Sequence, residues 1–477
     1  MVNNNEMAAC FSAAKLSRLI KAKKISPVEV LVEHVNLIEK LNPTINAIIN
    51  INITDAMESA KIAESDIMRG KWRSPMHGIP IGIKDITETK GLTTTYGSAL
   101  YKANVPMEDA EVVARLRKSG SIILCKTNTP EFAAGATTNN VLFGRTYNPW
   151  NLAMSPAGSS GGSAAAVASG MLPLAHGTDY GGSIRVPAAF CGLVGIRPTP
   201  GLIPNYPMPL SWDPGQVHGP LARTAEDAAM MLDAMVGISS LSPISMSPPW
   251  RSCQRQVQLT NNVRNLKIAY ISDMAGIGYE QEMGEICRKT IFELEHEDAA
   301  VSEIDFDISY GRKAYLTMRS EWMVGQQFER LNNIDKFGEN LANNVRAGLS
   351  LTPMQSAVAQ SIRNEIWHKF RILFLKYDYI VTPCSPVSPF SVELNFISHI
   401  NNVKLDTYID WIANTYLVTM VGLPAASVPA GLNKNGMPVG LQIIGNRFSE
   451  PGLLGVCKII QKIAKIGRPK LINSQVK

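Results

Sequence analysis

Residues 157–169 have the sequence Ala-Gly-Ser-Ser-Gly-Gly-Ser-Ala-Ala-Ala-Val-Ala-Ser, a glycine and serine loop that runs directly into a segment of small residues. The small side chains of residues 163–169 predict a helix that can pack closely on a sheet. A loop before a helix could hold a phosphate on its backbone N–H groups, but this loop lacks both GxxxxGK[ST] and GxGxxG spacing. On the loop alone, a flexible turn before a packed helix is the simpler interpretation.

A second glycine-rich segment, Gly177-Thr-Asp-Tyr-Gly-Gly-Ser-Ile-Arg185, follows that helix. Its Ser183 comes after two glycines and is flanked by Asp179 and Arg185. Upstream, Gly78-Ile-Pro-Ile-Gly-Ile-Lys-Asp85 predicts a short buried strand that delivers Lys84 at its end. A lysine that reaches solvent from a strand end would explain Lys84 alone. Two serine-bearing loops together with this lysine indicate catalysis.

Amide hydrolysis requires these residue types. It needs an oxygen nucleophile that loses its proton as it attacks, a base that takes the proton, and donors for the oxyanion. Glycines beside Ser183 let the backbone turn tightly, so that N–H groups can face a substrate carbonyl. No histidine lies beside either loop except His176. We therefore expect Lys84 to be the base, with a pKa that burial lowers from about 10.4 toward neutrality.

Strands and helices alternate along the chain, which predicts an α/β fold with a sheet flanked by helices. Ser26-Pro27-Val28-Glu29 has an N-cap serine, a proline at N1 and a glutamate at N3, so a helix should begin there and end at Asn42-Pro43. The other expected elements are a helix at 110–119 and strands at 121–125, 265–271, 379–381, 426–428 and 440–444.

The length leaves the number of domains open, but four sections can be distinguished along residues 1–477. Residues 1–70 form an N-terminal helical part, 71–240 a catalytic core, 250–376 a mostly helical variable region that covers the site, and 377–477 a return to the core sheet. A proline- and serine-rich stretch at 243–249 is typical of a linker or a surface excursion.

Composition argues against several classes of function. The chain is 45% hydrophobic and 18% charged, so a large core can form. Its net charge of +6 comes from scattered basic residues, apart from a short run at 21–24, and scattered charge does not favour nucleic-acid binding. Seven cysteines without a CxxC pair suggest neither a disulfide framework nor a zinc site and fit the reduced cytoplasm. Lys15 and Arg18 interrupt the apolar stretch at 7–20, so we expect neither export nor membrane attachment.

These motifs resemble the amidase signature family, serine amidases with a Ser–cis-Ser–Lys triad, over about residues 10–460. The matching stretches are Gly78–Asp85, Thr127–Asn128, Asn148–Trp150, Ser155–Ser163, Gly177–Gly192, Gly195–Thr199, Gly219–Thr224, Gly422–Ala425 and Pro438–Gln442. Many relatives carry lysine in place of Arg197, and many carry a smaller residue in place of Tyr180. The combination is far more specific than a single glycine-rich loop.

The resemblance implies a single domain over residues 1–477, an α/β fold with a mixed central sheet flanked by helices on both faces, and a role for each site residue. Ser183 would be the acylated nucleophile, Ser159 the bridging serine after a cis peptide bond, and Lys84 the base. The two serines are 24 residues apart, which agrees with the family's usual spacing. The oxyanion hole would consist of the backbone N–H groups of Tyr180, Gly181, Gly182 and Ser183, and the supporting residues would be Ser160, Asp179 and Arg185.

The expected partner is a small-molecule amide, either an aryl or alkyl amide, an anilide or a carbamate, with no cofactor and no metal. Thr127, Phe132, Ala133 and Gly135 are expected to contact it. The helical region after Gly278 contributes Trp322, Met323 and Phe328 as further candidates, although ordinary core packing explains such aromatic residues equally well. A homodimer remains open.

Two alternatives remain. The family includes the glutaminase subunit of a tRNA-dependent amidotransferase, in which glutamine normally follows the nucleophile turn and a later glycine-rich stretch ends in Ser-Ser-Leu-Asp. Here Val186 follows Arg185, and residues 201–213 read Gly-Leu-Ile-Pro-Asn-Tyr-Pro-Met-Pro-Leu-Ser-Trp-Asp. This departure favours a stand-alone amidase. The second alternative is a catalytically silent binding protein, against which the intact Lys84, Ser159 and Ser183 argue.

Overall fold

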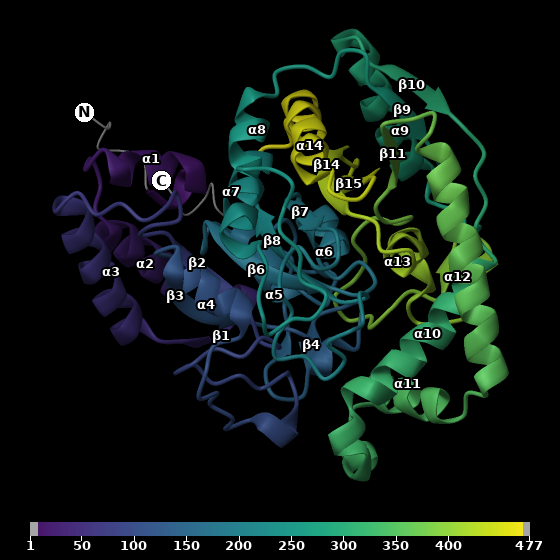
Figure 1. Ribbon diagram of the computed structural model, residues 1–477, viewed down its shortest axis with the longest axis horizontal. Coiled ribbons are helices and arrows are strands. Elements are labelled where there is room, and N and C mark those ends of the chain that lie inside the picture. The colour runs from purple at the N-terminus through teal and green to yellow at the C-terminus, as the bar shows by residue number, and fades with distance from the viewer. Residues whose placement is uncertain (1–7, 471–477) are drawn as a thin grey trace.

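In residues 8–470, the part of the chain that the computed structural model describes, eleven strands form one sheet (Figure 1). Their order is β1-β3-β2-β6-β8-β7-β14-β15-β11-β9-β10. The strands are β1 (Ile48–Ile51), β2 (Pro80–Lys84), β3 (Ile122–Thr127), β6 (Leu174–Asp179), β7 (Val194–Arg197), β8 (Val217–Ala222), β9 (Lys267–Tyr270), β10 (Ala300–Glu303), β11 (Tyr379–Pro383), β14 (Ala425–Leu432) and β15 (Pro438–Gly445). Two small hairpins pair β4 (Asn139–Asn140) with β5 (Gly144–Arg145) and β12 (His399–Ile400) with β13 (Val403–Lys404).

The sheet is mixed. Strands β3, β2 and β6 are parallel to one another, as are β11, β9 and β10. The strands between these groups, from β6 through β8, β7, β14 and β15 to β11, pair antiparallel, and so does β1 with β3. The predicted mixed sheet is therefore confirmed.

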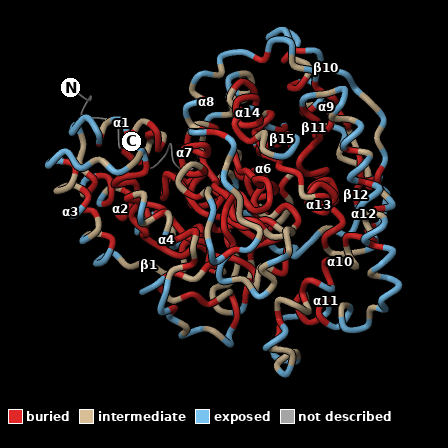
Figure 2. Tube along the Cα trace, viewed as in Figure 1, coloured by how far each residue is buried: buried red, intermediate tan, exposed pale blue. Residues whose placement is uncertain are grey.

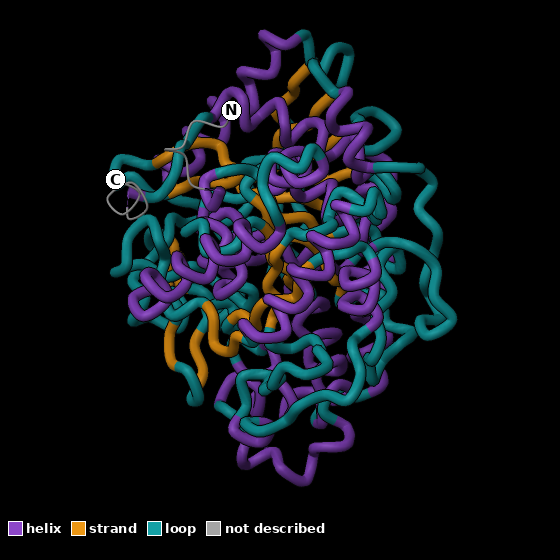
Figure 3. The backbone as a smooth tube through the Cα atoms, turned by 90° about the vertical axis from the view of Figure 1, so that its left-hand side faces the viewer, coloured by secondary structure: helices purple, strands orange, loops and turns teal. Residues whose placement is uncertain are grey.

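Helices cover both faces of the sheet, as predicted, because successive strand side chains point to opposite faces. On β6, for example, Leu174 belongs to the core on one face and Ala175 to the core on the other. The first face carries α1 (Ala13–Lys21), α4 (Glu111–Lys118), α7 (Ala225–Met235), α8 (Cys253–Leu259), α9 (Gln281–Phe292) and α14 (Glu450–Ala464). The opposite face carries α2 (Pro27–Ile45), α3 (Ile53–Met68), α5 (Gly161–Ala168), α6 (Arg185–Cys191), α10 (Gly311–Gln326), α12 (Pro353–Leu373) and α13 (Ala413–Met420). Figure 3 shows the strands running between these helical layers.

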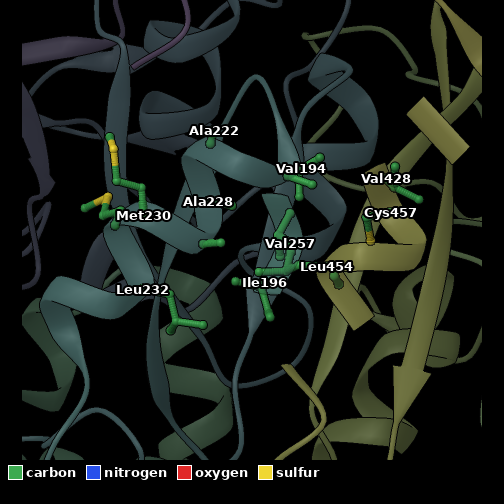
Figure 4. Close-up of a cluster of buried hydrophobic side chains, with 14 of the residues drawn as sticks. Val194, Ile196, Ala222, Ala228, Met230, Leu232, Val257, Val428, Leu454 and Cys457 are labelled. Atoms are coloured by element: carbon green, nitrogen blue, oxygen red, sulfur yellow. The ribbon is translucent and has the colours of Figure 1, made fainter. Parts of the chain in front are cut away.

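The core on the first face is built from interlocking aliphatic side chains. In Figure 4, Val194 and Ile196 of β7 lie among Leu232 of α7, Val257 of α8 and Leu454 of α14. All five are fully buried. Figure 2 shows that such burial extends through the centre of the molecule, whereas α3, α11 (Glu339–Leu349) and α12 have exposed sides. This packed centre holds the strand ends in place.

Most predicted elements are confirmed. The helices α4 and α5 and the strands β2, β3, β9, β11, β14 and β15 lie where the sequence predicts them. The Ser26–Glu29 capping box at the start of α2 is formed in both directions. The remaining short 3-10 helices are η1 (Ala8–Cys10), η2 (Ala99–Tyr101), η3 (Glu131–Ala133), η4 (Glu293–Glu297), η5 (Phe328–Lys336) and η6 (Asp410–Ile412).

One sequence prediction about an element boundary is wrong. Helix α2 does not end at Asn42-Pro43 but continues through Pro43 to Ile45, and Asn46 ends it in a left-handed conformation. Two sections predicted to be mainly helical also contribute strands, β1 and β10, at opposite ends of the sheet. Each is four residues long and pairs with one neighbour, so it depends on that neighbour more than on its own pattern.

Helices α10 and α11 form a small separate core over the end of the sheet where the predicted motifs lie. Trp322 and Met323 of α10 pack with Leu341 and Val345 of α11, and Tyr180 is packed against this cluster. In Figure 1 these green helices lie at the lower right, beside the lower half of α12. Within residues 8–470, no helix combines the length and the apolarity that crossing a membrane requires.

Candidate active site

The ends of β2 and β6 bring the predicted motifs together. These strands are parallel neighbours, with Gly82 opposite Ala175, so their carboxyl ends lie at the same edge of the sheet. Lys84 is the last residue of β2, and β6 ends at Asp179, immediately before the loop with Ser183. The loop with Ser159 leads into α5, which packs against β6.

The amino group of Lys84 is fully buried and contacts two hydroxyl groups. Its Nζ lies 2.6 Å from Ser159 Oγ and 2.9 Å from Thr178 Oγ1. Burial lowers the pKa of Lys84 well below its ordinary value, although the charge of Asp179 acts in the opposite direction. A neutral amine at this position can accept a proton from Ser159.

The loop before α5 has a constrained backbone. The peptide bond between Gly158 and Ser159 is cis, as the family resemblance implies. A Cβ atom at residue 158 would lie 2.7 Å from the carbonyl carbon of Thr137, so only glycine fits there. This close approach holds Ser159 against Lys84 in a fully buried position.

Ser160 joins the two serine loops. Its N–H donates to the carbonyl oxygen of Ser183 at 3.1 Å, and its hydroxyl lies 3.3 Å from both the backbone N and the carbonyl O of Thr178. Ser160 is itself fully buried. Its contacts fit the supporting position that the resemblance implies.

Asp179 and Arg185 fix the turn around Ser183. The Asp179 carboxylate accepts from the N–H groups of Gly182 and Ile184 at 2.9 and 3.1 Å and forms a buried ion pair with Arg185 at 2.8 Å. Burial alone would raise the pKa of Asp179, but the Arg185 guanidinium holds that pKa well below its usual range. Arg185 also donates to the carbonyl of Thr415 and to the side chains of Thr419 and Gln442.

The predicted oxyanion hole needs one correction. The N–H of Gly182 is already donated to Asp179, so it does not point freely toward a substrate. Within residues 8–470, no acceptor takes the N–H groups of Tyr180, Gly181 and Ser183. The carbonyls of Tyr180 and Gly181 accept from the hydroxyl groups of Tyr315 and Thr415 at 3.1 and 2.7 Å, which fixes the orientation of the intervening peptide groups.

Ser183 differs from its two proposed partners in exposure. Lys84 and Ser159 are fully buried, whereas Ser183 and the neighbouring Tyr180 are only partly buried. Of the three residues, Ser183 is therefore the one that a substrate can reach.

The residues predicted to contact substrate lie in different environments. Phe132 lines a cavity of about 350 Å³ together with Trp322 and Met323. Ala133 and Gly135 are not among the residues that line it. Thr127 is fully buried at the end of β3, and its hydroxyl lies 2.6 Å from Ser163 Oγ, so it holds α5 to the sheet.

Three other sequence inferences about the site are also changed. Phe328 is 72% exposed and does not line the cavity. Val186, which in the sequence favours a stand-alone amidase over a glutaminase, is buried in α6, so its side chain does not contact a substrate. The segment 206–212 was expected to contribute apolar side chains to the site. Tyr206 to Pro209 line the cavity, whereas Trp212 is 76% exposed.

Several residues that shape the site were not predicted from the sequence. Thr178 contacts Lys84, Tyr315 and Thr415 hold the turn, and Tyr96 and Gln327 line the cavity. Only Thr178 had a detectable signal, since it shares a strand face with His176 and adjoins Asp179. The others come from distant segments and are brought in by tertiary contacts.

The part of the chain that the structure describes contains no candidate metal site built from acidic, histidine or cysteine side chains. Among residues 8–470 there is no group of three or more that could hold a metal ion. All seven cysteines are free thiols.

Comparisons with known proteins agree on one family. A family model described as Amidase matches residues 29–454. The acylamidase of Rhodococcus erythropolis is 32% identical over 440 residues, which cover 91% of each chain. The A subunit of the glutamyl-tRNA(Gln) amidotransferase of Geobacillus kaustophilus is 33% identical over 485 residues, which cover 96% of this chain and 98% of the relative. The crystal structure of a bacterial aryl acylamidase of the amidase signature family superimposes with a TM-score of 0.89 at 28% identity, over 97% of this chain and 98% of that one.

Proposed function

The chain belongs to the amidase family, and from that membership we propose that it hydrolyses the C–N bond of a small-molecule carboxylic amide through a covalent acyl-enzyme on Ser183. Lys84, Ser159 and Ser183 form the proposed Ser–Ser–Lys triad. The substrate is an aryl or alkyl amide, an anilide or a carbamate. The similarity to an acylamidase and to an aryl acylamidase supports amides of this kind.

One observation carries the assignment of the triad. The buried Lys84 amine, whose pKa burial lowers, lies 2.6 Å from the hydroxyl of Ser159. A protonated lysine in solvent could not act as a base, and a lysine far from a hydroxyl would have no proton to take. Lys84 meets both requirements without a histidine.

The first half of the reaction forms the acyl-enzyme. Lys84 takes the proton of Ser159 as Ser159 takes the proton of Ser183, and Ser183 Oγ attacks the substrate carbonyl carbon. The N–H groups of Tyr180, Gly181 and Ser183 donate to the oxyanion that forms. As the C–N bond breaks, the relay returns the proton to the nitrogen, and the amine leaves.

The second half releases the acid. A water molecule loses a proton through Ser159 to Lys84 and attacks the acyl carbon, and the bond to Ser183 Oγ breaks as that oxygen regains a proton. Asp179 and Arg185 act as positioning residues, since Asp179 bonds to the N–H groups on both sides of Ser183.

Replacing the nucleophile tests the proposal. In Ser183→Ala, hydrolysis of a short aliphatic amide, an anilide or a carbamate should fall by about a thousandfold or more, because only binding and the oxyanion donors remain. Ser183 is partly exposed, so the loss of its hydroxyl leaves no buried cavity and the variant should fold. Turnover by the purified protein measures this loss. Mass spectrometry of an acid-quenched reaction should detect the acyl adduct on the wild type and not on Ser183→Ala.

A matched variant provides the control. Ser169→Ala removes the hydroxyl of a serine outside the site, which is buried and bonds to the carbonyl of Ala166 in its own helix, and should keep wild-type turnover. Near wild-type turnover by Ser183→Ala, or an adduct on another residue, would contradict the assignment.

A second candidate function is that of the glutaminase subunit of a tRNA-dependent amidotransferase. The 33% identity to an amidotransferase chain over nearly the full length of both proteins favours it. It would use the same triad on glutamine and deliver ammonia to a partner. A silent binding protein remains the third possibility, and the Ser183→Ala comparison tests it as well. The cytoplasmic location and the homodimer remain predictions.

A further inference from the structure

Helix α10 reaches the back of the turn that holds Ser183. Tyr315 of this helix is buried, and its hydroxyl donates to the carbonyl of Tyr180 at 3.1 Å. That carbonyl and the N–H of Gly181 belong to one peptide group. In a planar trans peptide the two bonds point in opposite directions, so a donor behind the carbonyl fixes the direction of the N–H. The N–H of Gly181 has no acceptor within residues 8–470 and can donate to an oxyanion.

The position of the Tyr315 hydroxyl is set before any substrate binds. Its ring is stacked on that of the buried Tyr416, with ring centres 4.2 Å apart and an angle of 4° between the planes. A Cβ atom at residue 181 would lie 2.5 Å from the hydroxyl oxygen, so this oxygen fills the space beside Gly181. Donors that are already oriented need no rearrangement when negative charge develops.

Arg319 places a positive charge next to this contact. It lies one helical turn after Tyr315, on the same face of α10, and is buried. Its guanidinium donates to the Tyr408 hydroxyl at 3.0 Å, and its Nε has no acceptor in the part of the chain that the structure describes. Burial alone would lower the pKa of Arg319, but the hydroxyls of Tyr408, Tyr315 and Tyr180 hold that pKa above its ordinary value. The charge is therefore kept, and hydroxyl groups rather than a carboxylate surround it.

This charge acts on the Tyr315 hydroxyl. Burial raises the pKa of Tyr315 to about 12, and Arg319 opposes that rise. A cation that favours loss of the phenol proton makes the O–H a stronger donor. Hydrogen bonds in series polarise one another, so a stronger bond to the Tyr180 carbonyl also strengthens the N–H of Gly181 as a donor.

We propose that Tyr315 and Arg319 are positioning residues of the oxyanion hole, which act on the reaction through the N–H of Gly181. Tyr315 orients and polarises the peptide group between Tyr180 and Gly181, and the buried charge of Arg319 strengthens that bond. The inference rests on the proposed function, since it needs the oxyanion that forms when Ser183 attacks. It gives α10 a part in the chemistry as well as in covering the site.

Removing one hydroxyl tests the role of Tyr315. The substrate is whichever of a short aliphatic amide, an anilide and a carbamate the wild type cleaves fastest. In Tyr315→Phe, kcat should fall about tenfold while KM stays within about twofold, because the oxyanion exists in the transition state and not in bound substrate. Tyr416→Phe is the matched control. It removes a buried hydroxyl of the same stack that bonds to Asp410 instead of the turn, and Asp410 keeps its ion pair with Arg312. Both kinetic parameters should stay at wild-type values.

A double-mutant cycle tests whether Arg319 acts through Tyr315. Arg319→Met removes the charge and keeps an unbranched side chain, and kcat should fall about fivefold. Arg319→Lys keeps a positive charge and should recover most of this loss. The double variant Tyr315→Phe, Arg319→Met should be no slower than Tyr315→Phe alone, because the charge has no hydroxyl left to act on. A loss equal to the product of the two single losses would contradict this role of Arg319.

Hydrogen exchange tests the same contact without a substrate. The amides of residues 180–183, followed by peptide mass spectrometry, should exchange about threefold or more faster in Tyr315→Phe than in the wild type, because the Tyr180 carbonyl loses its donor. In Tyr416→Phe they should exchange as in the wild type. Circular dichroism checks the folding of each variant, and Arg319→Lys replaces Arg319→Met in the cycle if the latter fails to fold.

Wild-type kcat in a folded Tyr315→Phe protein would overturn the proposal, as would unchanged exchange at residues 180–183 or an equal loss of kcat in Tyr416→Phe. The proposed function fails separately. If Ser183→Ala hydrolysed amides like the wild type, the triad would be wrong whatever Tyr315 does. If turnover depended on Ser183 but not on Tyr315, only this inference would be wrong.

Discussion

The buried position of Lys84 determines the protonation state of its amine. Its amine is removed from water at the end of a fully buried strand, and the nearest oxygens are two neutral hydroxyls rather than a carboxylate. Since desolvation disfavours the charged form, the neutral amine persists at lower pH than in a free lysine. The same residue on the surface would remain an ammonium ion.

The pH dependence of activity should therefore follow Lys84. Its pKa in the folded protein is lowered, so the active neutral form prevails above that pKa, and kcat/KM should fall as the pH drops through it. This acidic limb should lie well below the ordinary lysine range. In Lys84→Met, turnover should fall by about a hundredfold or more, and the remainder should lack the limb. Rate profiles from about pH 5 to pH 10 make the measurement.

Lys126 provides the matched control. It is also fully buried, on the neighbouring strand, and burial lowers its pKa to about 8, but its amine bonds to Thr87, Thr89 and Thr94 instead of a serine loop. Lys126→Met should be less stable yet keep the limb at its wild-type position. If the acidic limb shifted in Lys126→Met but not in Lys84→Met, the titrating group would be Lys126, and the prediction for Lys84 would be wrong.

At this scale the sequence was informative where chemistry depends on residue type and uninformative where it depends on geometry. Lys84, Ser159 and Ser183 stand out because a strand-end lysine and two glycine-flanked serines are rare together. That Gly182 donates its N–H to Asp179 could not be inferred, because it depends on how the turn closes. Gln327 gave no signal, since nothing in its own segment indicates that it faces a cavity.

Among the elements, α5 shows how packing outweighs intrinsic helix propensity. Gly162, in its first turn, approaches the backbone of Asn128 so closely that an added Cβ would collide with its N and lie 2.6 Å from its O. The Cβ would also lie 2.8 Å from the carbonyl oxygen of Ala47. Asn128 and Ala47 are joined by a backbone hydrogen bond next to the ends of β3 and β1, and such backbone atoms cannot move aside as a flexible side chain can.

Gly162→Ala should therefore be destabilising even though alanine favours a helix by about 1 kcal/mol. We expect a loss of about 1–3 kcal/mol in the free energy of unfolding, measured by urea denaturation. Gly455→Ala in α14 is the control, because its Cβ would meet only the side chain of Thr260, which can rotate. A Gly162→Ala protein as stable as this control would show that the sheet can accommodate the methyl group.

Strands β6 and β8 carry a pair of histidines that should make stability depend on pH. His176 Nε2 lies 2.9 Å from His218 Nδ1, and His218 Nε2 lies 2.9 Å from Asn205 Oδ1. Burial lowers the pKa of His218 to about 4 and that of His176 well below its ordinary value. Both rings are therefore neutral in the folded protein at neutral pH.

The sign follows from proton linkage. Below about pH 6.5 the histidines of the unfolded chain bind protons, whereas the same histidines in the folded protein do not. The contribution of the histidine pair to stability is therefore complete above that pH and is lost as the pH falls toward 4. The double variant His176→Gln, His218→Gln should lose less stability over this interval, by about 1.4 kcal/mol per pH unit for each proton no longer bound. Urea unfolding at several pH values measures the slope. The exposed His368→Gln serves as control, and equal slopes for the wild type and the double variant would contradict the account.

The elements that were predicted correctly carry their signal locally, and the others do not. The capping box of α2 lies within four residues, whereas the end of α2 was misjudged because a helix can pass a proline when the carbonyl one turn earlier, that of Glu39, is near solvent. Strands β1 and β10 were missed because each is short and is an edge strand of the sheet, paired with a single neighbour.

For the whole molecule, the sequence predicts the class of fold and leaves the arrangement open. Alternating elements indicate an α/β protein, but the strand order depends on which distant segments pair. Strand β7 lies between β8 and β14, whose nearest residues are separated by more than two hundred positions of chain. The position of α10 over the site likewise depends on contacts between distant segments, since its Trp322 and Tyr315 contact Tyr180.

The assembled site should prefer uncharged amides to glutamine. Free glutamine carries an ammonium and a carboxylate, and each must find a counter-charge when it leaves water. The charged residues of the cavity wall, Glu88 and Arg330, are bonded to Tyr96 and Tyr101. Around them the segment from Tyr206 to Pro209 contributes mainly apolar bulk. We expect the purified chain, without a partner, to hydrolyse at least one uncharged amide, anilide or carbamate with a higher kcat/KM than glutamine.

The comparison needs only the isolated chain and a blank. Initial rates with each substrate, corrected with Ser183→Ala, give the kcat/KM ratios directly. Glu88→Gln and Arg330→Gln sharpen the test, because a glutaminase that used these charges would lose glutamine turnover in both variants while keeping activity on a neutral amide. If glutamine is the best substrate of the wild type, and above all if its cleavage requires an added partner chain, the stand-alone amidase is wrong. The apolar wall would then have to admit a charged substrate only when a partner completes the site.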